Sequence, residues 1–354
     1  MADRRPLRIA QLAPLWAPVP PPSYGGRERV VHLLAEGLVR RGHDVTLVAS
    51  GDSRTTGRLE APVGRCLIDL MAAGEAYEEL PYQLEAVAGA LAPDRGFDLV
   101  HSHLGAAFVP LTGLAACPVV HSVPHAVTVD DRWVLARHPD ARVCFVSEAQ
   151  RRQAPDLANG RVVHNACDFS AFQAVPAPGG YLAFLGRMAA HKGPATAIRL
   201  ALRTGWPIVL AGEPMTGEER RYFADEVEPL IDGDRVRHVG GVDDRQKATL
   251  LGGAAALVFP IDWEEPFGIV MVEAMACGTP VVALSRGSVP EVVDEGVTGF
   301  ATSDPEALPD LLELARGLDR RRVRAHAERR FGVTAMVNAY EAVYRDAVEA
   351  GRCA

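Results

Sequence analysis

Residues 255–283, AALVFPIDWEEPFGIVMVEAMACGTPVVA, contain the pattern that decides the fold. An apolar run of strand length, Ala255–Phe259, leads into an acidic loop, an apolar run of helical length at Ile269–Cys277, and a second strand-like run at Pro280–Ala283. A strand, a helix and a second strand in succession are typical of a parallel sheet that is covered on both faces. This stretch therefore predicts an α/β protein.

The same alternation runs along the whole chain. Arg27–Arg41 shows the clearest helical period, with its apolar residues on one face and Gly42 as a C-terminal stop. Further buried strands are predicted at 7–12, 44–49, 97–101, 118–122, 142–147, 162–164, 181–185, 207–211 and 236–239. The chain is thus expected to contain doubly wound α/β domains.

A segment rich in proline and glycine, AFQAVPAPGG at 171–180, interrupts this alternation and predicts a linker at 169–180. We expect one Rossmann-like domain at 1–168 and a second at 181–333, each built on a parallel sheet. An amphipathic helix in 334–354 is expected to cross back to the first domain. Ligands bind at the carboxyl ends of parallel strands, so a binding cleft is expected between the two sheets.

Length and composition narrow the class of protein. The length of 354 residues suits two hydrophobic cores. The net charge of −8 argues against a nucleic-acid partner. None of the six cysteines forms a C-x-x-C pair, so reduced thiols and no zinc site are expected. Arg8 and Gln11 interrupt the apolar N-terminal stretch, which argues against a signal peptide, and no 18-residue window is apolar throughout. We therefore expect a cytoplasmic protein.

Two motifs offer groups that could bind phosphate. Ser23-Tyr24-Gly25-Gly26 precedes the Arg27 helix, whose free N–H groups and positive dipole end favour an anion; a plain turn is the alternative. Gly186-Arg187 and His191-Lys192-Gly193 follow the first strand of the second domain. Their two cations could hold a diphosphate through charge-assisted hydrogen bonds, and solvated surface charges are the alternative.

A third motif, EEPFGIVMVE at 264–273, places two carboxylates eight positions apart. Glu265 comes just before the apolar helix and Glu273 lies within it. A carboxylate on a buried helix needs hydrogen-bonding partners, and two adjacent sugar or ribose hydroxyls can supply them. Pairing of Glu273 with a nearby arginine is the alternative.

These motifs together resemble glycosyltransferase family 4, which has the GT-B fold. The most specific part is Phe259–Phe300, which includes the E-x7-E pair of Glu265 and Glu273. GRMAAHKG at 186–193 resembles the donor-phosphate segment of the family, and the stretch from Tyr24 to Ser50 resembles its glycine loop and first helix. The resemblance spans nearly the whole chain.

The resemblance implies a role for each candidate residue. Arg187 and Lys192 would stabilise the leaving diphosphate, Glu265 would contact the transferred sugar, and Glu273 would bind the donor ribose. The residues implied to line the substrate site are Gly25, Gly26, Gly186, Gly212, Val239, Phe267, Gly268 and Ile269. Transfer with retention of the anomeric configuration is implied, with the leaving phosphate helping to deprotonate the acceptor.

Histidines near the ends of two N-terminal strands complete the candidate set. The family usually has a histidine soon after the strand that reads PVVHSV here, and this chain offers His125 one position away from the expected place. His121 is the competitor, although strand alternation would bury it. His103, at the end of another strand, is a second candidate for lining the cleft.

Other readings of the same residues remain open at this level. Asp232-Gly233-Asp234 could bind a divalent ion, but its position between a helix and a strand favours a turn, so no metal is expected. A nucleotide-sugar epimerase of the same architecture is the main alternative function, and a hinged sugar-binding protein is another. A dinucleotide-dependent oxidoreductase would need a G-x-G-x-x-G turn, which is absent from the sequence.

The expected partners are a nucleoside-diphosphate sugar, with a uridine donor implied by the family, and a small-molecule or saccharide acceptor. Acceptor contacts are expected from the loops at 53–79 and 125–139. No tightly bound cofactor is expected, membrane contact is at most peripheral, and the sequence does not predict the oligomeric state.

Overall fold

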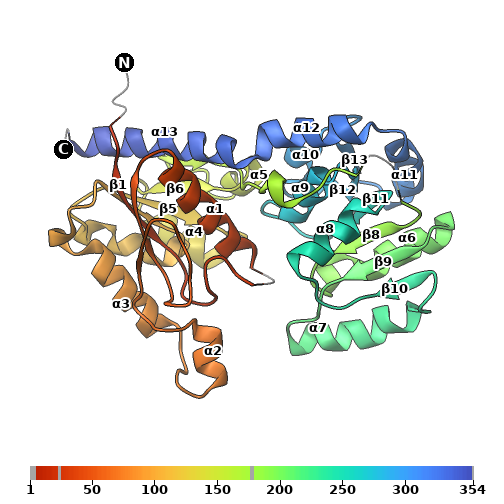
Figure 1. Ribbon diagram of the computed structural model, residues 1–354, viewed down its shortest axis with the longest axis horizontal. Helices are drawn as coiled ribbons and strands as arrows, with labels where there is room; N and C mark the ends of the chain where they lie inside the picture. Colours follow the sequence, from red (N-terminus) through yellow and green to blue (C-terminus); the bar gives the residue numbers. More distant parts are fainter. Residues whose placement is uncertain (1–4, 23–24, 176–178, 353–354) are drawn as a thin grey trace. The chain divides into compact units, whose positions relative to one another are not determined.

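The computed structural model describes residues 5–22, 25–175 and 179–352. These residues form two compact units (Figure 1). Unit 1 contains the described residues up to Ala166 together with those from Val333 onward, and unit 2 is Cys167–Gly332. Among the described residues, no helix is both long and apolar enough to cross a membrane.

Unit 1 is built on a parallel sheet in the order β3-β2-β1-β4-β5-β6-β7. Period-2 alternation divides its side chains between two faces. Ala10 and Val100 pack against α3 (Leu80–Leu91), whereas Gln11 and His101 point to the opposite face and contact α13 (Val333–Arg352). The strands are β1 (Arg8–Leu12), β2 (Asp44–Val48), β3 (Arg58–Glu60), β4 (Leu99–Ser102), β5 (Val119–Val123), β6 (Arg142–Phe145) and β7 (Gly160–Val162).

Helices cover both faces of this sheet. The α-helices of unit 1 are α1 (Gly26–Arg40), α2 (Leu67–Ala72), α3 (Leu80–Leu91), α4 (Val129–Leu135), α5 (Glu148–Arg151) and α13 (Val333–Arg352), and its 3-10 helices are η1 (Pro93–Arg95) and η2 (Ala106–Leu114). The last helix, α13, contacts α1, β4 and β5, so the C-terminal segment belongs to the same compact unit as the N-terminal strands.

Unit 2 has a six-stranded parallel sheet in the order β10-β9-β8-β11-β12-β13. Its strands are β8 (Leu182–Leu185), β9 (Ile208–Ala211), β10 (Val236–His238), β11 (Ala256–Phe259), β12 (Val281–Leu284) and β13 (Gly299–Thr302). From β8 the chain adds β9 and β10 on one side and then β11, β12 and β13 on the other, so the strand order reverses between β8 and β11. Such a switch point in a doubly wound sheet is where ligands bind. The carboxyl ends of β8 and β11 lie next to each other at this point.

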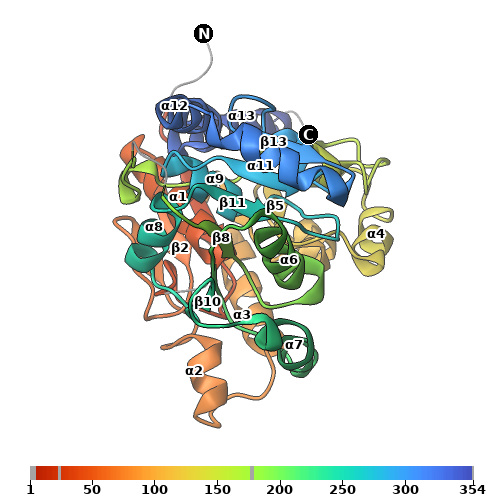
Figure 2. The same ribbon diagram turned by 90° about the vertical axis from the view of Figure 1, so that its right-hand side faces the viewer.

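The helices of unit 2 lie on both sides of its sheet (Figures 1 and 2). α6 (Pro194–Thr204) and α11 (Leu308–Arg316) share one apolar core with the strands, while α9 (Ile269–Ala276) packs against β11 and β12 beside α8 (Asp244–Gly252). The remaining helical segments are η3 (Phe169–Ala171), η4 (Ala190–Lys192), α7 (Gly217–Tyr222), the π-helical η5 (Phe223–Val227), η6 (Glu228–Leu230), α10 (Val289–Val292), η7 (Pro305–Ala307) and α12 (Arg320–Phe331).

The proline-rich segment expected to be a linker is attached to unit 2 where it is described. Arg324 on α12 donates to the carbonyl oxygens of Phe169 and Phe172, at 2.7 and 2.8 Å, and Val175 N–H donates to the carbonyl of Cys277 at 3.1 Å. Residues 176–178 of the predicted linker lie outside the described residues. The segment 169–175 is therefore an ordered edge of unit 2.

The structure describes five of the six cysteines, Cys66, Cys117, Cys144, Cys167 and Cys277. The five described cysteines are free thiols, and four of them are buried. Burial raises the pKa of Cys144 to about 12, so this thiol is protonated and unreactive at neutral pH. Cys353 lies outside the described residues.

Candidate active site

In unit 2, Glu265 and Lys192 form an ion pair at the carboxyl edge of the sheet. Lys192 Nζ donates to Oε2 of Glu265 at 2.5 Å, and Trp263 Nε1–H donates to the same oxygen at 2.8 Å. The ammonium also lies 4.5 Å from the centre of the Trp263 ring. Lysine and carboxylate are only 16% and 10% exposed, so neither is a solvated surface charge.

A glycine fixes the backbone between Glu265 and the helix that follows it. Gly268 adopts φ 73°, which favours glycine, and α9 begins at the next residue, Ile269. Phe267 is buried, and its ring meets the Phe331 ring edge-on at 5.7 Å. This turn leaves Ile269 half-buried at the first position of α9, where backbone N–H groups have no helical partner.

Arg187 has a different carboxylate partner. Its guanidinium lies 2.9 Å from Oε1 of Glu219 on α7, and Oε2 of Glu219 accepts from Met215 N–H at 2.7 Å, just before that helix. Arg187 also lies 3.5 Å from Nε2 of His191. Burial, Lys192 and Arg187 together lower the pKa of His191, so this ring is neutral at pH 7.

Glu273 is paired with Lys247 rather than with an arginine. The Lys247 ammonium on α8 contacts Oε1 of Glu273, and the two side chains are 13% and 7% exposed. The alternative prediction, that Glu273 pairs with an arginine, is therefore wrong about the cation. The packing of α8 against α9 sets the partner of this carboxylate, and distance along the sequence does not. Lys247 was not among the residues singled out from the sequence.

The four candidate charged residues of unit 2 thus each have a partner of opposite sign, in three ion pairs. Arg187 pairs with Glu219, Lys192 with Glu265, and Glu273 with Lys247. Since each cation is balanced, an incoming diphosphate would compete with carboxylates for the donors of Arg187 and Lys192. When no anion is bound, the carboxylates keep both cations paired. When an anion binds, it can take the place of these carboxylates.

The remaining candidate residues of unit 2 form backbone turns at the ends of β8, β9 and β10. Gly186 N–H donates to the carbonyl of Ala211 at 3.1 Å, and Gly212 N–H donates to Gly240 at 2.8 Å. Gly212 has φ 124°, and a Cβ there would lie 1.9 Å from the carbonyl oxygen of Gly186, so only glycine fits. Val239 is half-exposed at the end of β10.

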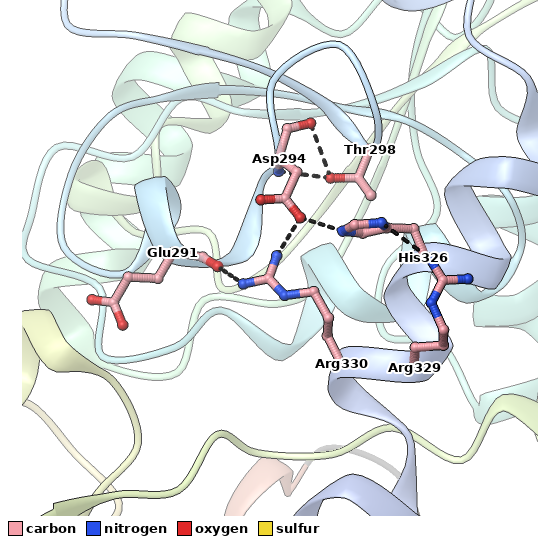
Figure 3. A network of polar contacts seen from close by, with 6 residues as sticks. All are labelled: Glu291, Asp294, Thr298, His326, Arg329 and Arg330. Carbon is pink, nitrogen blue, oxygen red and sulfur yellow. Dashed lines mark hydrogen bonds and ion pairs between the residues drawn. The ribbon is translucent and has the colours of Figure 1, made fainter.

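A second network supports the segment that follows β12 (Figure 3). Asp294 accepts from both His326 and Arg330 of α12, and Arg330 also donates to the carbonyl of Glu291 at 2.6 Å. This holds α10 against α12. Just before α10, Ser288 N–H donates to the carbonyl of Glu265 at 2.9 Å. The Asp294 network therefore supports a segment that contacts the Glu265 loop through Ser288.

In unit 1, the described part of the glycine loop leads directly into α1. Gly25 is the N-cap with φ 154°, and Gly26 is the first helical residue. Arg27 pairs with Glu28 at 3.1 Å within the first turn. Ser23 and Tyr24 of the predicted motif lie outside the described residues.

His125 lies at the surface of unit 1, and its ring would be 2.9 Å from a Cβ placed on Gly105. Its Nε2 is 3.5 Å from the Asp131 carboxylate, which also caps α4. Partial burial and the charge of Arg27 lower the pKa of His125, while the charge of Asp131 opposes them. His125 is therefore neutral at pH 7 and able to accept a hydrogen bond.

His103 and His121 are both buried. His103 Nε2 bonds Oε1 of Gln11 at 2.7 Å, and burial lowers its pKa to about 3. The expectation that His121 is buried is confirmed, since it is 2% exposed, although every residue of β5 is buried and alternation is therefore not the cause. His103 is thus a neutral group in the interior of unit 1, in a network that continues from Gln11 to Tyr344 on α13 at 3.0 Å.

The turn interpretation of Asp232-Gly233-Asp234 is confirmed. Asp232 Oδ1 accepts from the N–H groups of Asp234 and Val236, both at 2.9 Å. Within the described ranges, the only cluster of three residues spaced to share a metal ion is Asp52, Cys66 and Asp69, which lies elsewhere in unit 1 and is mostly exposed.

Comparison with known proteins places the chain in a family. The family profile described as "Glycosyltransferase Family 4" matches residues 24–170, and "Glycosyl transferases group 1" matches residues 169–327. D-inositol 3-phosphate glycosyltransferase of Mycobacterium bovis is 30% identical, over 93% of this chain and 80% of the relative. The mycobacterial proteins of the same name in Mycobacterium tuberculosis match equally well.

Solved structures give the same result for the fold. AviGT4, a glycosyltransferase involved in avilamycin A biosynthesis, is 26% identical with a TM-score of 0.76, covering 98% of this chain and 99% of that one. Sucrose-phosphate synthase of Thermosynechococcus elongatus is 22% identical with a TM-score of 0.77, over 97% and 99%. HepE of Anabaena, solved with UDP and glucose, is 18% identical with a TM-score of 0.71, over 95% and 98%.

Two Rossmann-like units, each with a parallel sheet, and these relatives together define a glycosyltransferase of the GT-B fold, an enzyme that transfers sugars. The chain belongs to glycosyltransferase family 4. The relatives reported above are transferases and synthases, so an epimerase of the same architecture is not favoured.

Proposed function

We propose that this enzyme transfers a sugar from UDP-sugar to a hydroxyl group of a small-molecule or saccharide acceptor, with retention of the anomeric configuration. The observation that carries the proposal is the pair of cations at the switch point of unit 2: Arg187 and Lys192, each held by a carboxylate. HepE, which shares the fold, is known with UDP and with UDP-glucose, and this favours a uridine donor.

In the proposed reaction, Arg187 and Lys192 exchange their carboxylate partners for the diphosphate of the donor. Negative charge develops on the diphosphate as the bond to the sugar breaks, and preorganised cations stabilise that charge. Glu265, released from Lys192, accepts from sugar hydroxyls. The backbone at Phe267, Gly268 and Ile269 holds further hydroxyls, Glu273 binds the ribose, and the turns at Gly186, Gly212 and Val239 adjoin the nucleotide.

The acceptor is proposed to bind in unit 1, near Gly25, Gly26 and His125, whereas His103, which was expected to line the cleft, is buried and bonded to Gln11. The leaving phosphate deprotonates the acceptor hydroxyl, which attacks from the face that the leaving group vacates. No divalent ion is required, because two cationic side chains supply the charge. Retained turnover in EDTA supports this last point, and loss of turnover that Mg²⁺ restores overturns it.

A thermal-shift panel with UDP, GDP, ADP, dTDP and NAD tests the donor class. A ligand at 100 times its Kd adds about 2.7 kcal/mol to stability, which raises Tm by several degrees. A shift with UDP and none with NAD is expected. A shift with another nucleoside diphosphate alone would correct the base, and a shift with NAD alone would overturn the proposal. NMR of the product anomer then tests retention.

A further inference from the structure

The chain uses lysine at only two positions, although it has 37 lysines and arginines together. These two are Lys192 and Lys247, and each contacts one glutamate of the E-x7-E pair. An ammonium is a compact point charge that can bond one carboxylate oxygen in a narrow space, whereas a guanidinium is a wide planar fork. Compact cations therefore stand at both carboxylates of this motif.

The pair of Lys247 and Glu273 is buried between α8 and α9. Lys247 also lies 3.4 Å from Asp244, one turn earlier on α8, and 5.7 Å from the centre of the Phe172 ring. Cys167 is close by, and burial and the Glu273 charge raise the pKa of its thiol, so it stays neutral. Lys247 is therefore the cation that balances Glu273 on an otherwise apolar helix.

The geometry leaves part of this carboxylate available. Lys247 contacts Oε1, and within the described residues no hydrogen-bond donor contacts Oε2 of Glu273. A carboxylate with one oxygen held by an ammonium keeps a fixed orientation, and its remaining lone pairs can accept from two adjacent hydroxyls. Two adjacent hydroxyls are what a ribose offers and a 2′-deoxyribose lacks.

We propose that Lys247 is a positioning residue that holds the Glu273 carboxylate so that it selects ribonucleoside over 2′-deoxyribonucleoside diphosphates. This rests on the proposed donor site, in which Glu273 faces the ribose. Lys247 touches no substrate atom itself and acts through the orientation and charge of Glu273. Lys192, on the other lysine–glutamate pair, acts on the diphosphate and does not distinguish the two sugars.

Isothermal titration with UDP and 2′-deoxyuridine 5′-diphosphate tests this. The wild-type protein is expected to bind UDP about tenfold more tightly, because a hydrogen bond to a charged group contributes about 1.5 kcal/mol or more and tenfold corresponds to about 1.4 kcal/mol. Lys247→Met should reduce this preference to about one by weakening UDP binding alone. Lys247→Arg keeps the charge and should restore part of the preference.

Lys192→Met is the matched control, since it removes the other lysine in the same way. It should weaken both nucleotides by a similar factor and leave the preference unchanged. An unchanged preference in folded Lys247→Met protein overturns the inference alone. A wild-type protein that binds both nucleotides equally overturns the role of Glu273 as well, and one that binds neither overturns the proposed donor.

Discussion

At the scale of single residues, the site is a set of charges that satisfy one another. Burying a lone ammonium or carboxylate is costly, so each of the candidate groups in unit 2 comes with a partner. The sequence predicted Arg187, Lys192, Glu265 and Glu273, but it did not predict how they pair. Glu219, Lys247 and Trp263 carry no motif of their own, and the first two reach the site from other helices.

Removing either phosphate-binding cation should slow turnover. Arg187→Ala and Lys192→Ala are each expected to lower kcat by about 10²-fold or more, on the scale of a lost oxyanion donor. Steady-state kinetics with UDP-sugar measure this. Arg316→Ala removes an exposed arginine of α11 that pairs with Glu313 and lies over the Trp206 ring, and it should leave kcat unchanged. Normal kcat in both site variants would show that the diphosphate binds elsewhere.

The N–H group of Trp263 should contribute to turnover. Trp263→Phe keeps an aromatic ring beside Lys192 but removes the donor to Glu265, so the carboxylate loses one of its two bonds. We expect kcat to fall about tenfold, since such a bond contributes about 1.5 kcal/mol or more. The donor KM should change little, because the diphosphate contacts remain.

Trp206→Phe provides the comparison for this variant. Trp206 lies against the core of unit 2 and beside Arg316, away from Glu265. Its loss should affect stability and not kcat. If Trp263→Phe raised KM without lowering kcat, the indole would be acting on donor binding rather than on Glu265.

At the scale of elements, the burial of a strand decides whether it can be predicted from the sequence. Strands such as β11 and β12 are apolar throughout because both faces are covered, and they lie within a residue of the predicted positions. Strands β3 and β13 were not predicted. Both lie at sheet edges, and β3 contains Arg58 and Glu60, which give no apolar signal.

The Asp294 network should stabilise unit 2 through α12 (Figure 3). Arg330→Met removes the bonds to Asp294 and to the Glu291 carbonyl, which together are expected to lower the free energy of unfolding by about 1–3 kcal/mol. In a unit of this size, Tm should fall by about 2–4 °C per kcal/mol. Differential scanning calorimetry measures both.

The neighbouring arginine is a close control for that change. Arg329 reaches only Nδ1 of His326 in this network, at 3.4 Å, so Arg329→Met should shift Tm far less. Because Nδ1 accepts from Arg329, Nε2 of His326 carries the proton and donates to Asp294. Equal effects of the two substitutions would mean that Asp294 is held mainly by His326.

At the scale of the whole molecule, the two units differ in whether their buried polar side chains are charged or neutral. The candidate residues of unit 2 are ion pairs, whereas the sheet of unit 1 buries uncharged histidines. His101, His103 and His121 are each at most 3% exposed, and the bonds of His101 to Tyr344 and Ser122 tie α13 to β4 and β5. A buried neutral histidine is tolerated only while it stays unprotonated.

Unit 1 should therefore be the acid-sensitive half of the protein. Burial lowers the pKa of His103 to about 3 and of His121 to about 4, below the value of about 6.5 expected in the unfolded chain. Between these values the unfolded state binds more protons, so the free energy of unfolding falls as pH falls, by up to about 1.4 kcal/mol per pH unit for each histidine. This loss should begin near pH 6.5 and continue toward pH 4.

Urea denaturation of the wild-type protein and of His121→Phe at pH 7.5, 6.5, 5.5 and 4.5 measures this dependence. The substitution leaves Thr112 without its bond to the ring, so it lowers stability at pH 7.5. Its slope between pH 6.5 and 4.5 should nevertheless be smaller by up to about 1.4 kcal/mol per pH unit, because one titrating group is gone. Parallel curves for the two proteins would mean that His121 is already protonated in the folded state, and that the acid sensitivity arises elsewhere.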